Sequence, residues 1–391
     1  KRRARAPNNV ARRIMVAQHE GDWLHDGQGA DDVAASFRGR LDKREAALIP
    51  SRRNRTIRPQ MPKFSILDLA PVPEGKGPGD ALRNTIDLAR HADSMSYTRY
   101  WLAEHHNMIG IASAATAVII GQVAAATRCI RVGAGGVMLP NHAPLVIAEQ
   151  FGTLAELFPD RIDLGLGRAP GTDQRTSRAL RVQPGEAENF SNDVLELQAY
   201  LAPATPDQTL RAVPGAGTNV PLWILGSSHY GATLAAMLGL PYAFASHFAP
   251  DALMSALQIY RERFKPSEQL PASYAMVGMN VFAAETDEEA KRLFTSAQQR
   301  ALGIVQGDRG LLPPPVDSMD GLWQPVDKAR VGRMLACSIV GSRQTVRAGL
   351  ERFIAQTGGD EYIVATAIHD HAARVRSYAI LDEVVRDAGW M

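Results

Sequence analysis

The sequence predicts an α/β fold, a (β/α)8 barrel of the TIM type, and three observations support this prediction. Eight short apolar runs alternate with longer segments that carry apolar residues at helical spacing. A run such as Tyr100–Ala103 is apolar throughout, as is typical of a parallel strand that is covered on both faces. The chain of 391 residues is also long enough for one domain of about 300 residues.

The predicted strands are short and rich in aliphatic and aromatic residues. In chain order they span residues 64–69, 98–103, 130–139, 161–166, 222–225, 242–246, 273–283 and 362–365.

The predicted helices are delimited by capping residues and prolines. The Pro- and Gly-rich stretch 71–79 cannot lie inside a helix, so we expect Asp80 to cap the first one. Thr286 and Glu289 form a capping-box pattern. Further helices open at Ser113, after Pro144, at 186, at Ser228, at 250 and at Ser342, and a last one ends near Asp387. Residues 303–325, with their glycines and three consecutive prolines, interrupt the repeat and are predicted to be an insertion.

Composition limits the classes of protein that need to be considered. No apolar run approaches the roughly 20 residues of a membrane span, and no signal peptide is visible. The two cysteines, Cys129 and Cys337, argue against a disulfide framework or a structural zinc site. We therefore expect a cytoplasmic protein with no metal.

The N-terminal segment differs in charge from the rest of the chain. Residues 1–60 contain 14 Lys or Arg and 7 Asp or Glu, whereas the whole chain has a net charge of only +2. A basic tail can bind nucleic acid or an anionic membrane, but charge is the only such signal here. We favour an extension outside the fold, with the barrel domain at 61–391, and expect neither a nucleic-acid nor a membrane partner.

The side chains that follow the predicted strands are the candidates for chemistry, because enzymes with this fold use the carboxyl ends of the strands. Strand 98–103 is followed by Glu104, His105, His106 and Asn107, which can transfer protons or form hydrogen bonds. With an unperturbed pKa near 6.5, His105 could exchange protons at neutral pH without a large shift. A His-His pair can also be surface decoration or a capping device. Ala70, Asn107, Asn141 and His142, at the ends of the first three strands, are expected to face the substrate.

A possible phosphate site follows the fifth strand. The turn Gly226, Ser227, Ser228, His229 and Tyr230 opens a helix, where backbone N–H groups and hydroxyls can bind an anion. Arg168, at the end of the neighbouring strand, could reach the same anion. Gly-Ser-Ser is also a common helix cap.

Three glycines inside the third strand, Gly133, Gly135 and Gly136, need an explanation, because glycine weakens a strand. Either a flat ring lies over the strand, or the barrel packs tightly there.

Five motifs together resemble the bacterial-luciferase-like flavin monooxygenases, from about residue 62 to the C-terminus. They are Trp101-Leu-Ala-Glu-His-His-Asn107, Val132-Gly-Ala-Gly-Gly-Val-Met-Leu-Pro140, Ala148-Glu-Gln150, Arg161-Ile-Asp-Leu-Gly-Leu-Gly-Arg168 and Leu225-Gly-Ser-Ser228. The resemblance implies reduced FMN at the barrel mouth, which reacts with dioxygen to give a flavin hydroperoxide that oxidises a small organic molecule. It also implies a separate flavin reductase as partner, and we expect a homo-oligomer.

The resemblance assigns roles to individual residues. His105 matches the catalytic base of luciferases and His106 its neighbour in the motif. Gly135 and Gly136 match a pair joined by a cis peptide under the flavin ring, and Arg168 with Ser227–Tyr230 matches the phosphate grip. Gly167 stands where luciferases have a cysteine beside the flavin, which argues against light emission.

Two other functions stay open. One is a deazaflavin-dependent hydride-transfer enzyme of the same superfamily, and the other is a non-catalytic flavin-binding barrel. The substrate is not predicted. Its pocket is expected to be lined by loops 71–79, 171–185 and 303–325.

Overall fold

A computed structural model describes residues 61–169, 173–183 and 185–390 of the chain. The predicted extension at 1–60 lies outside the described residues. Among the helices that are described, none is long and apolar enough to cross a membrane.

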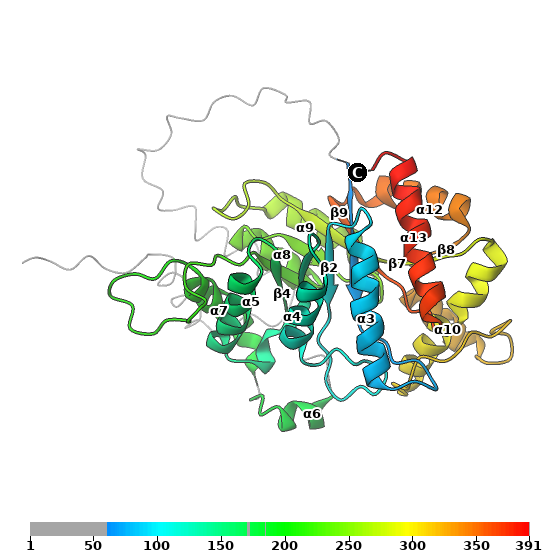
Figure 1. Ribbon diagram of the computed structural model, residues 1–391, viewed down its shortest axis with the longest axis horizontal. Coiled ribbons are helices and arrows are strands. Elements are labelled where there is room, and N and C mark those ends of the chain that lie inside the picture. The colour runs from blue at the N-terminus through cyan, green and yellow to red at the C-terminus, as the bar shows by residue number, and fades with distance from the viewer. Residues whose placement is uncertain (1–60, 170–172, 184, 391) are drawn as a thin grey trace, which may run out of the picture. The chain divides into compact units, whose positions relative to one another are not determined.

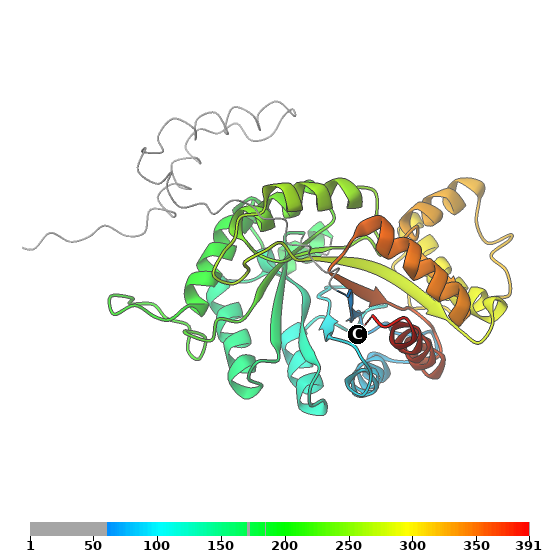
Figure 2. The ribbon, with the colours of Figure 1, turned by 90° about the horizontal axis from the view of Figure 1, so that it is seen from above.

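Eight parallel strands form a closed barrel, which confirms the predicted fold class. Neighbouring strands pair in chain order, β6 pairs with β7 to close one side, and β9 lies between β7 and β1 (Figures 1 and 2). The barrel strands are β1 (Lys63–Asp68), β2 (Arg99–Leu102), β3 (Arg131–Met138), β4 (Ile162–Gly167), β5 (Leu222–Gly226), β6 (Tyr242–Phe244), β7 (Ala275–Ala283) and β9 (Glu361–Ala365).

The helices surround the barrel, and most begin within a few residues of the predicted positions. They are α3 (Pro78–Asp93), α4 (Thr116–Ala126), α5 (Pro144–Leu157), α6 (Gln174–Ala179), α7 (Glu186–Leu201), α8 (His229–Leu238), α9 (Leu253–Arg263), α10 (Asp287–Gln306), α11 (Pro325–Met334), α12 (Arg343–Thr357) and α13 (His371–Asp387), with a short 3-10 turn η1 (Leu139–Asn141).

Two predicted helix starts are wrong for local reasons. The first helix begins at Pro78, and the carboxylate of Asp80 accepts the Gly77 N–H at 3.0 Å from inside the first turn. The second begins at Thr116 instead of Ser113, because the Ser113 hydroxyl donates to the carbonyl of Ala103 and keeps that segment against the end of β2.

The interruption after α10 differs from its predicted bounds. Helix α10 continues to Gln306, so residue 303 lies inside it, and its cap at Thr286 is as predicted, with the hydroxyl accepting the Glu289 N–H at 3.2 Å. The interruption consists of residues 307–324, α11 and an additional strand, β8 (Ser338–Gly341), which pairs only with β7 outside the ring. Neither α11 nor β8 was expected from the sequence.

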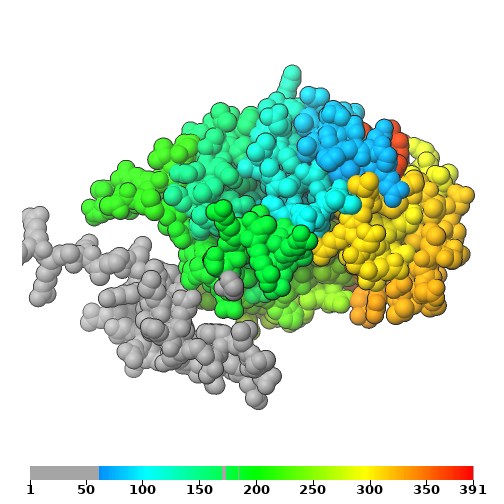
Figure 3. Space-filling model, turned by 90° about the horizontal axis from the view of Figure 1, so that it is seen from below, coloured from blue at the N-terminus to red at the C-terminus, as the bar shows by residue number. Residues whose placement is uncertain are grey.

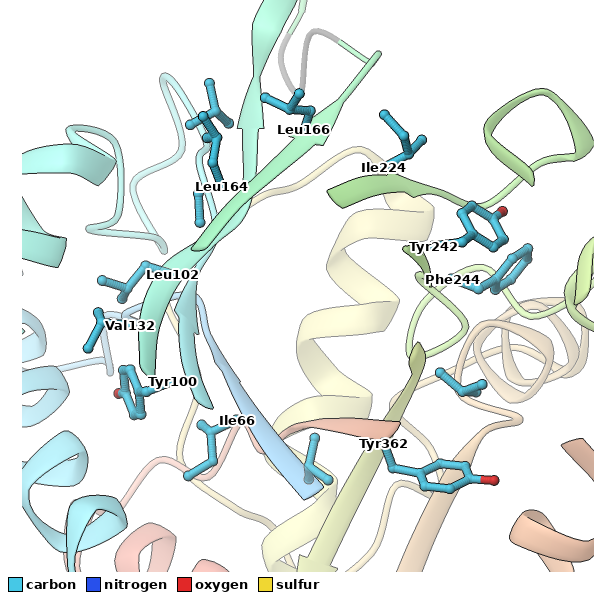
Figure 4. Close-up of a cluster of buried hydrophobic side chains, with 14 of the residues drawn as sticks. Ile66, Tyr100, Leu102, Val132, Leu164, Leu166, Ile224, Tyr242, Phe244 and Tyr362 are labelled. Carbon is cyan, nitrogen blue, oxygen red and sulfur yellow. The ribbon is translucent and has the colours of Figure 1, made fainter. Parts of the chain in front are cut away.

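Side chains of the barrel strands fall into two sets. One set, including Ile66, Val132, Leu164 and Tyr242, points away from the ring towards the helices (Figure 4). The other set fills the inside and comprises Leu67, Trp101, Ala103, Trp223, Ala243, Met276, Ile363 and Ala365.

A buried charge network closes the amino-terminal end of the barrel. Arg99 forms ion pairs of 2.7 Å with both Asp163 and Glu361, and its guanidinium carbon lies 4.8 Å from the ring centre of Trp223. Because this end is filled, an interior cavity can open only towards the carboxyl ends of the strands.

Candidate active site

A cavity of ≈ 610 Å³ lies at the carboxyl ends of the strands, within the size range of small-molecule sites. Its floor is the aromatic and aliphatic layer around Trp101 and Met276. Figure 3 shows one side of the molecule. On this side the residues near β2, in cyan, lie between the α6–α7 region, in green, and the α10 region, in yellow. Most of the lining is apolar, and its charged members are Glu104, Arg168, Arg300 and Arg309.

The two glycines at the centre of β3 line the cavity, and the bond between Gly135 and Gly136 is cis. A Cβ atom at Gly135 would lie 2.8 Å from Cδ1 of Leu67, and one at Gly136 would lie 2.7 Å from the carbonyl oxygen of Gly165. At Gly133 the contact would be 2.5 Å, to the carbonyl oxygen of Asp163. Tight packing therefore explains Gly133, whereas Gly135 and Gly136 both pack tightly and face the cavity.

Two other glycines of the lining are not required by packing. Apart from its neighbours in the chain, a Cβ atom at Gly167 or at Gly226 would meet no atom of the described residues closer than 3.8 Å, and neither residue has a positive φ. The two residues end neighbouring strands, β4 and β5. The missing side chains leave room in the cavity, beside Gly135 and Gly136 on the next strand.

The end of β4 and the first turn of α8 together offer an anion site. The guanidinium carbon of Arg168 lies 4.2 Å from the ring centre of Tyr230. Ser228 is the N-cap of α8, and no side chain caps the first turn, so its N–H groups are available to a ligand. Gly226, Ser227, Ser228 and Tyr230 line the cavity, but His229 does not: its Nε2 lies 2.7 Å from the hydroxyl of Ser255.

His105 lies in the cavity wall, and its backbone N–H donates to the backbone carbonyl oxygen of Ser113 at 3.0 Å. Its Nδ1 is buried and has no hydrogen-bond partner among the described residues. Burial lowers the pKa of His105 to about 4, and the positive charges of Arg300 and Arg309 add to this effect. The expectation of a pKa without a large shift was therefore wrong, because the sequence shows neither the burial of this side chain nor the two arginines that come close in space.

His106 lies outside the cavity lining, in a cluster around Glu104. Nε2 of His106 and Nε2 of His142 lie 2.7 and 2.8 Å from the same oxygen, Oε1 of Glu104, and the other oxygen accepts the Met138 N–H at 3.1 Å. Burial alone would raise the pKa of Glu104, but these hydrogen bonds outweigh it and keep the pKa below its usual value. Glu104 therefore stays charged and ties the loop after β2 to the end of β3.

The Glu104 cluster has the residue types of a metal site, since three potential ligand atoms lie within 4.8 Å of one another. Ligand atoms of a tetrahedral zinc ion are about 3.3 Å apart, given metal–nitrogen distances of about 2.0–2.1 Å. The nitrogen–oxygen distances of 2.7 and 2.8 Å are those of direct hydrogen bonds. The described geometry is thus a hydrogen-bonded cluster.

The residues predicted to face the substrate do not line the cavity. Ala70 is fully buried, and Asn107 donates to the hydroxyl of Thr176 at 2.9 Å. His142 bonds to Glu104, and Asn141 lies in η1. Of the loops expected around the pocket, only 303–325 contributes described residues to the main cavity, namely Ile304 and Arg309.

Comparison with known proteins agrees with the motifs and the cavity. The family described as luciferase-like monooxygenase matches residues 61–361. A protein named luciferase-like monooxygenase from Escherichia coli K12 is 53% identical over 322 residues, which cover 82% of this chain and 96% of that protein. The chain belongs to the luciferase-like monooxygenase family.

Solved structures show the same architecture. The crystal structure of apo-MsnO8 has a TM-score of 0.74 and 37% identity, covering 83% of this chain and 98% of the other. The oxygenating constituent of 3,6-diketocamphane monooxygenase from Pseudomonas putida, solved with FMN, has a TM-score of 0.62 at 19% identity, covering 83% and 97%. The latter likeness shows the shared fold. This luciferase-like protein is an oxidoreductase, as its family membership shows.

Several residues of the site in this luciferase-like protein were not predicted from its sequence. His247 follows β6 and lines the cavity, and its ring packs on Gly278, where a Cβ atom would lie 2.6 Å from Nδ1. Burial lowers the pKa of His247 to about 4, with a further contribution from His105. The rule that located His105, which considers residues after each strand, would also have located His247. Phe190 of α7 and Arg300 of α10 come from helices, and that rule does not reach them.

Proposed function

We propose that this luciferase-like protein binds reduced FMN in the main cavity and uses dioxygen to oxidise a small organic molecule. The observation that carries the proposal is the wall without side chains on three neighbouring strands, β3 to β5, next to the uncapped first turn of α8. A planar ring can lie on such a wall while a phosphate binds the helix amides and Arg168. Bound reduced FMN supplies the electrons that activate dioxygen.

The cavity residues then have distinct tasks. Arg168 and the turn Ser227–Tyr230 hold the phosphate, and Gly135, Gly136, Gly167 and Gly226 leave room for the ring. His105 presents a neutral imidazole at pH 7, because its pKa is about 4, and it can accept or donate one hydrogen bond at the reacting atoms. Trp101 and Met276 form the floor, which excludes water from below.

The proposal also includes a protein partner, a cellular compartment and an oligomeric state. A separate flavin reductase would deliver the reduced FMN, and the protein would act in the cytoplasm as a homo-oligomer. Cys129 and Cys337 are both free thiols, as a reducing compartment favours.

Anaerobic titration tests the cofactor. Reduced FMN should bind with 1:1 stoichiometry, and reduced deazaflavin should bind more weakly. On admission of air, oxygen uptake should exceed that of free flavin when aldehydes, aromatics or sulfonates are screened as substrates. A preference for deazaflavin would support the hydride-transfer alternative, and flavin binding with no substrate-dependent turnover would support a non-catalytic barrel.

A further inference from the structure

Arg300 of α10 is a cation inside the site that has no anionic partner in the described part of the chain. This residue lines the main cavity and also a second cavity of ≈ 120 Å³. The only hydrogen bond found for it runs from Nη1 to the carbonyl oxygen of Gly110 at 3.3 Å, and no described carboxylate forms an ion pair with it. Burial lowers its pKa to about 10, and no neighbouring negative charge offsets this effect. Most of its five donors remain available to a ligand.

Arg300 is half-buried, and the two fully buried arginines of the described chain, Arg99 and Arg374, are both neutralised. Arg99 lies 2.7 Å from both Asp163 and Glu361, and Arg374 lies 2.7 Å from Asp68. Enclosing a charge without a counter-ion costs free energy, so proteins pair buried charges. Arg300 departs from this pattern, and it does so at the wall of a ligand cavity.

Among the described residues of the main-cavity lining, positive charges outnumber negative ones, with three arginines and one carboxylate. Glu104 is the only acidic residue of the main-cavity lining among the described residues, and both of its oxygens are bound by His106, His142 and the Met138 N–H. Arg309, which is exposed, lines the same cavity and adds positive charge near His105. The local field therefore favours an anion that comes from outside the protein.

This cation is separate from the proposed phosphate grip. Arg168 belongs to the end of β4 and contacts Tyr230, whereas Arg300 belongs to α10, which is seen through the ring of strands in Figure 4. The second cavity, which Arg300 borders and the phosphate grip does not, has a mainly apolar lining that includes Leu69, Phe248, Phe282, Ile304 and Leu335.

We propose that Arg300, assisted by Arg309, binds the anionic headgroup of the organic substrate, a carboxylate or a sulfonate, while an apolar part of the substrate enters the second cavity. This inference rests on the proposed function, because it assigns the substrate class of the same site. It predicts selection for amphiphilic anions over neutral molecules of the same length.

Calorimetric titration of the protein saturated with oxidised FMN tests the preference for anions, and no turnover takes place. The probes are octanesulfonate, octanoate and octanol. One of the two anions should bind at least 10-fold more tightly than octanol, as expected for a charge-assisted hydrogen bond, and the better anion distinguishes sulfonate from carboxylate. Equal binding of all three probes would overturn the proposal.

Variants assign the preference to Arg300. Arg300→Met should remove the preference for the anion, whereas Arg300→Lys, which keeps the charge, should retain part of it. Arg292→Met is the matched control on the same helix, because Arg292 forms an exposed ion pair with Asp317 and should change nothing. If Arg300→Met binds the better anion as tightly as the wild type does, Arg300 is not the site.

FMN binding in the same variants separates the two proposals. Arg300→Met should bind FMN like the wild type, as followed by flavin fluorescence. If FMN displaces octanesulfonate competitively, Arg300 holds the flavin phosphate and the inference fails. If FMN does not bind at all but the apoprotein shows the Arg300-dependent preference, the anion site stands and the cofactor assignment fails.

Discussion

The guanidinium carbon of Arg168 lies 4.2 Å from the ring centre of Tyr230, so the last residues of β4 are held against the first turn of α8. Arg168→Ala should weaken binding of FMN by about 10- to 150-fold, the range of a charge-assisted contact of about 1.5–3 kcal/mol. Riboflavin, which lacks the phosphate, should lose little affinity. Fluorescence titration with both ligands measures this, and Arg175→Ala on exposed α6 is the control. Equal losses for the two ligands would give Arg168 a packing role.

The glycines of the lining offer a test of the flavin position. Gly226→Val should lower the affinity for both FMN and riboflavin at least 10-fold while leaving the melting temperature unchanged, because the space beside Gly226 is empty of protein atoms out to 3.8 Å. Gly133→Ala is the contrasting variant. Its methyl group would meet the Asp163 carbonyl oxygen at 2.5 Å, so it should destabilise the fold by about 1–3 kcal/mol. A Gly226→Val protein that binds both ligands normally would place the ring elsewhere.

His105 should affect turnover more than binding. His105→Ala should slow product formation by about 10² to 10⁴, the range of general acid–base help, and leave the affinity for reduced FMN within a few fold. Release of hydrogen peroxide should rise because oxygen activation is no longer coupled to the substrate. Product and peroxide assays in one reaction measure both effects.

His106→Ala is the internal control for that experiment. His106 bonds to Glu104 outside the cavity lining, so its loss should lower stability or substrate affinity and spare the rate of the chemical step. A normal His105 variant beside a slow His106 variant would exchange the two roles.

Stability should depend on pH through His105 and His247. The pKa of each is about 4 in the folded protein and about 6.5 in the unfolded chain. Between these values the unfolded chain binds more protons, so the free energy of unfolding rises with pH from about 4 to about 6.5 and is constant above. Burial and the charges of Glu186 and Glu196 raise the pKa of Asp193 to about 6. Below pH 6 this carboxyl therefore has the opposite effect, and its contribution to the free energy of unfolding falls as the pH rises.

The histidine contribution can be isolated by difference. The double variant His105→Gln, His247→Gln should lose less stability than the wild type between about pH 7 and pH 5, as measured by urea unfolding. Asp193 is present in both proteins and cancels. Parallel pH curves for the two proteins would show that these histidines are protonated in the fold.

Removal of residues 1–60 tests the predicted domain boundary. A chain that starts at Met61 should keep its unfolding temperature and its FMN affinity within error, since β1 begins at Lys63. Loss of either property would make the extension part of the functional unit.

The sequence was sufficient to predict the barrel because eight strands are apolar enough to be recognised singly. Strand β8 escaped because its four residues pair with β7 alone and are mostly half-buried, so they carry no strong apolar pattern. Helix α11 escaped for a similar reason, since Val331 is its only buried residue.

The site was only partly predictable. His105 and Arg168 follow strands and Gly135 lies within one, and the barrel fixes the direction in which each strand runs. His142 also follows a strand, but the η1 turn directs it towards Glu104, and a sequence does not reveal such a turn. Arg300 lies 13 residues into α10, and only the three-dimensional path of that helix brings it to the cavity.

The cavity lining combines separate parts of the chain, among them the glycines of β3 to β5 and residues of α10 and α11. If the proposed assignments hold, substitutions in α10 or α11 would change what the enzyme oxidises without altering how it holds its cofactor. Related proteins with this barrel could then acquire different substrates through substitutions in this one short region. For the protein engineer, residues 297–334 are the natural target of a library, and the glycines of β3 to β5 should be left unchanged.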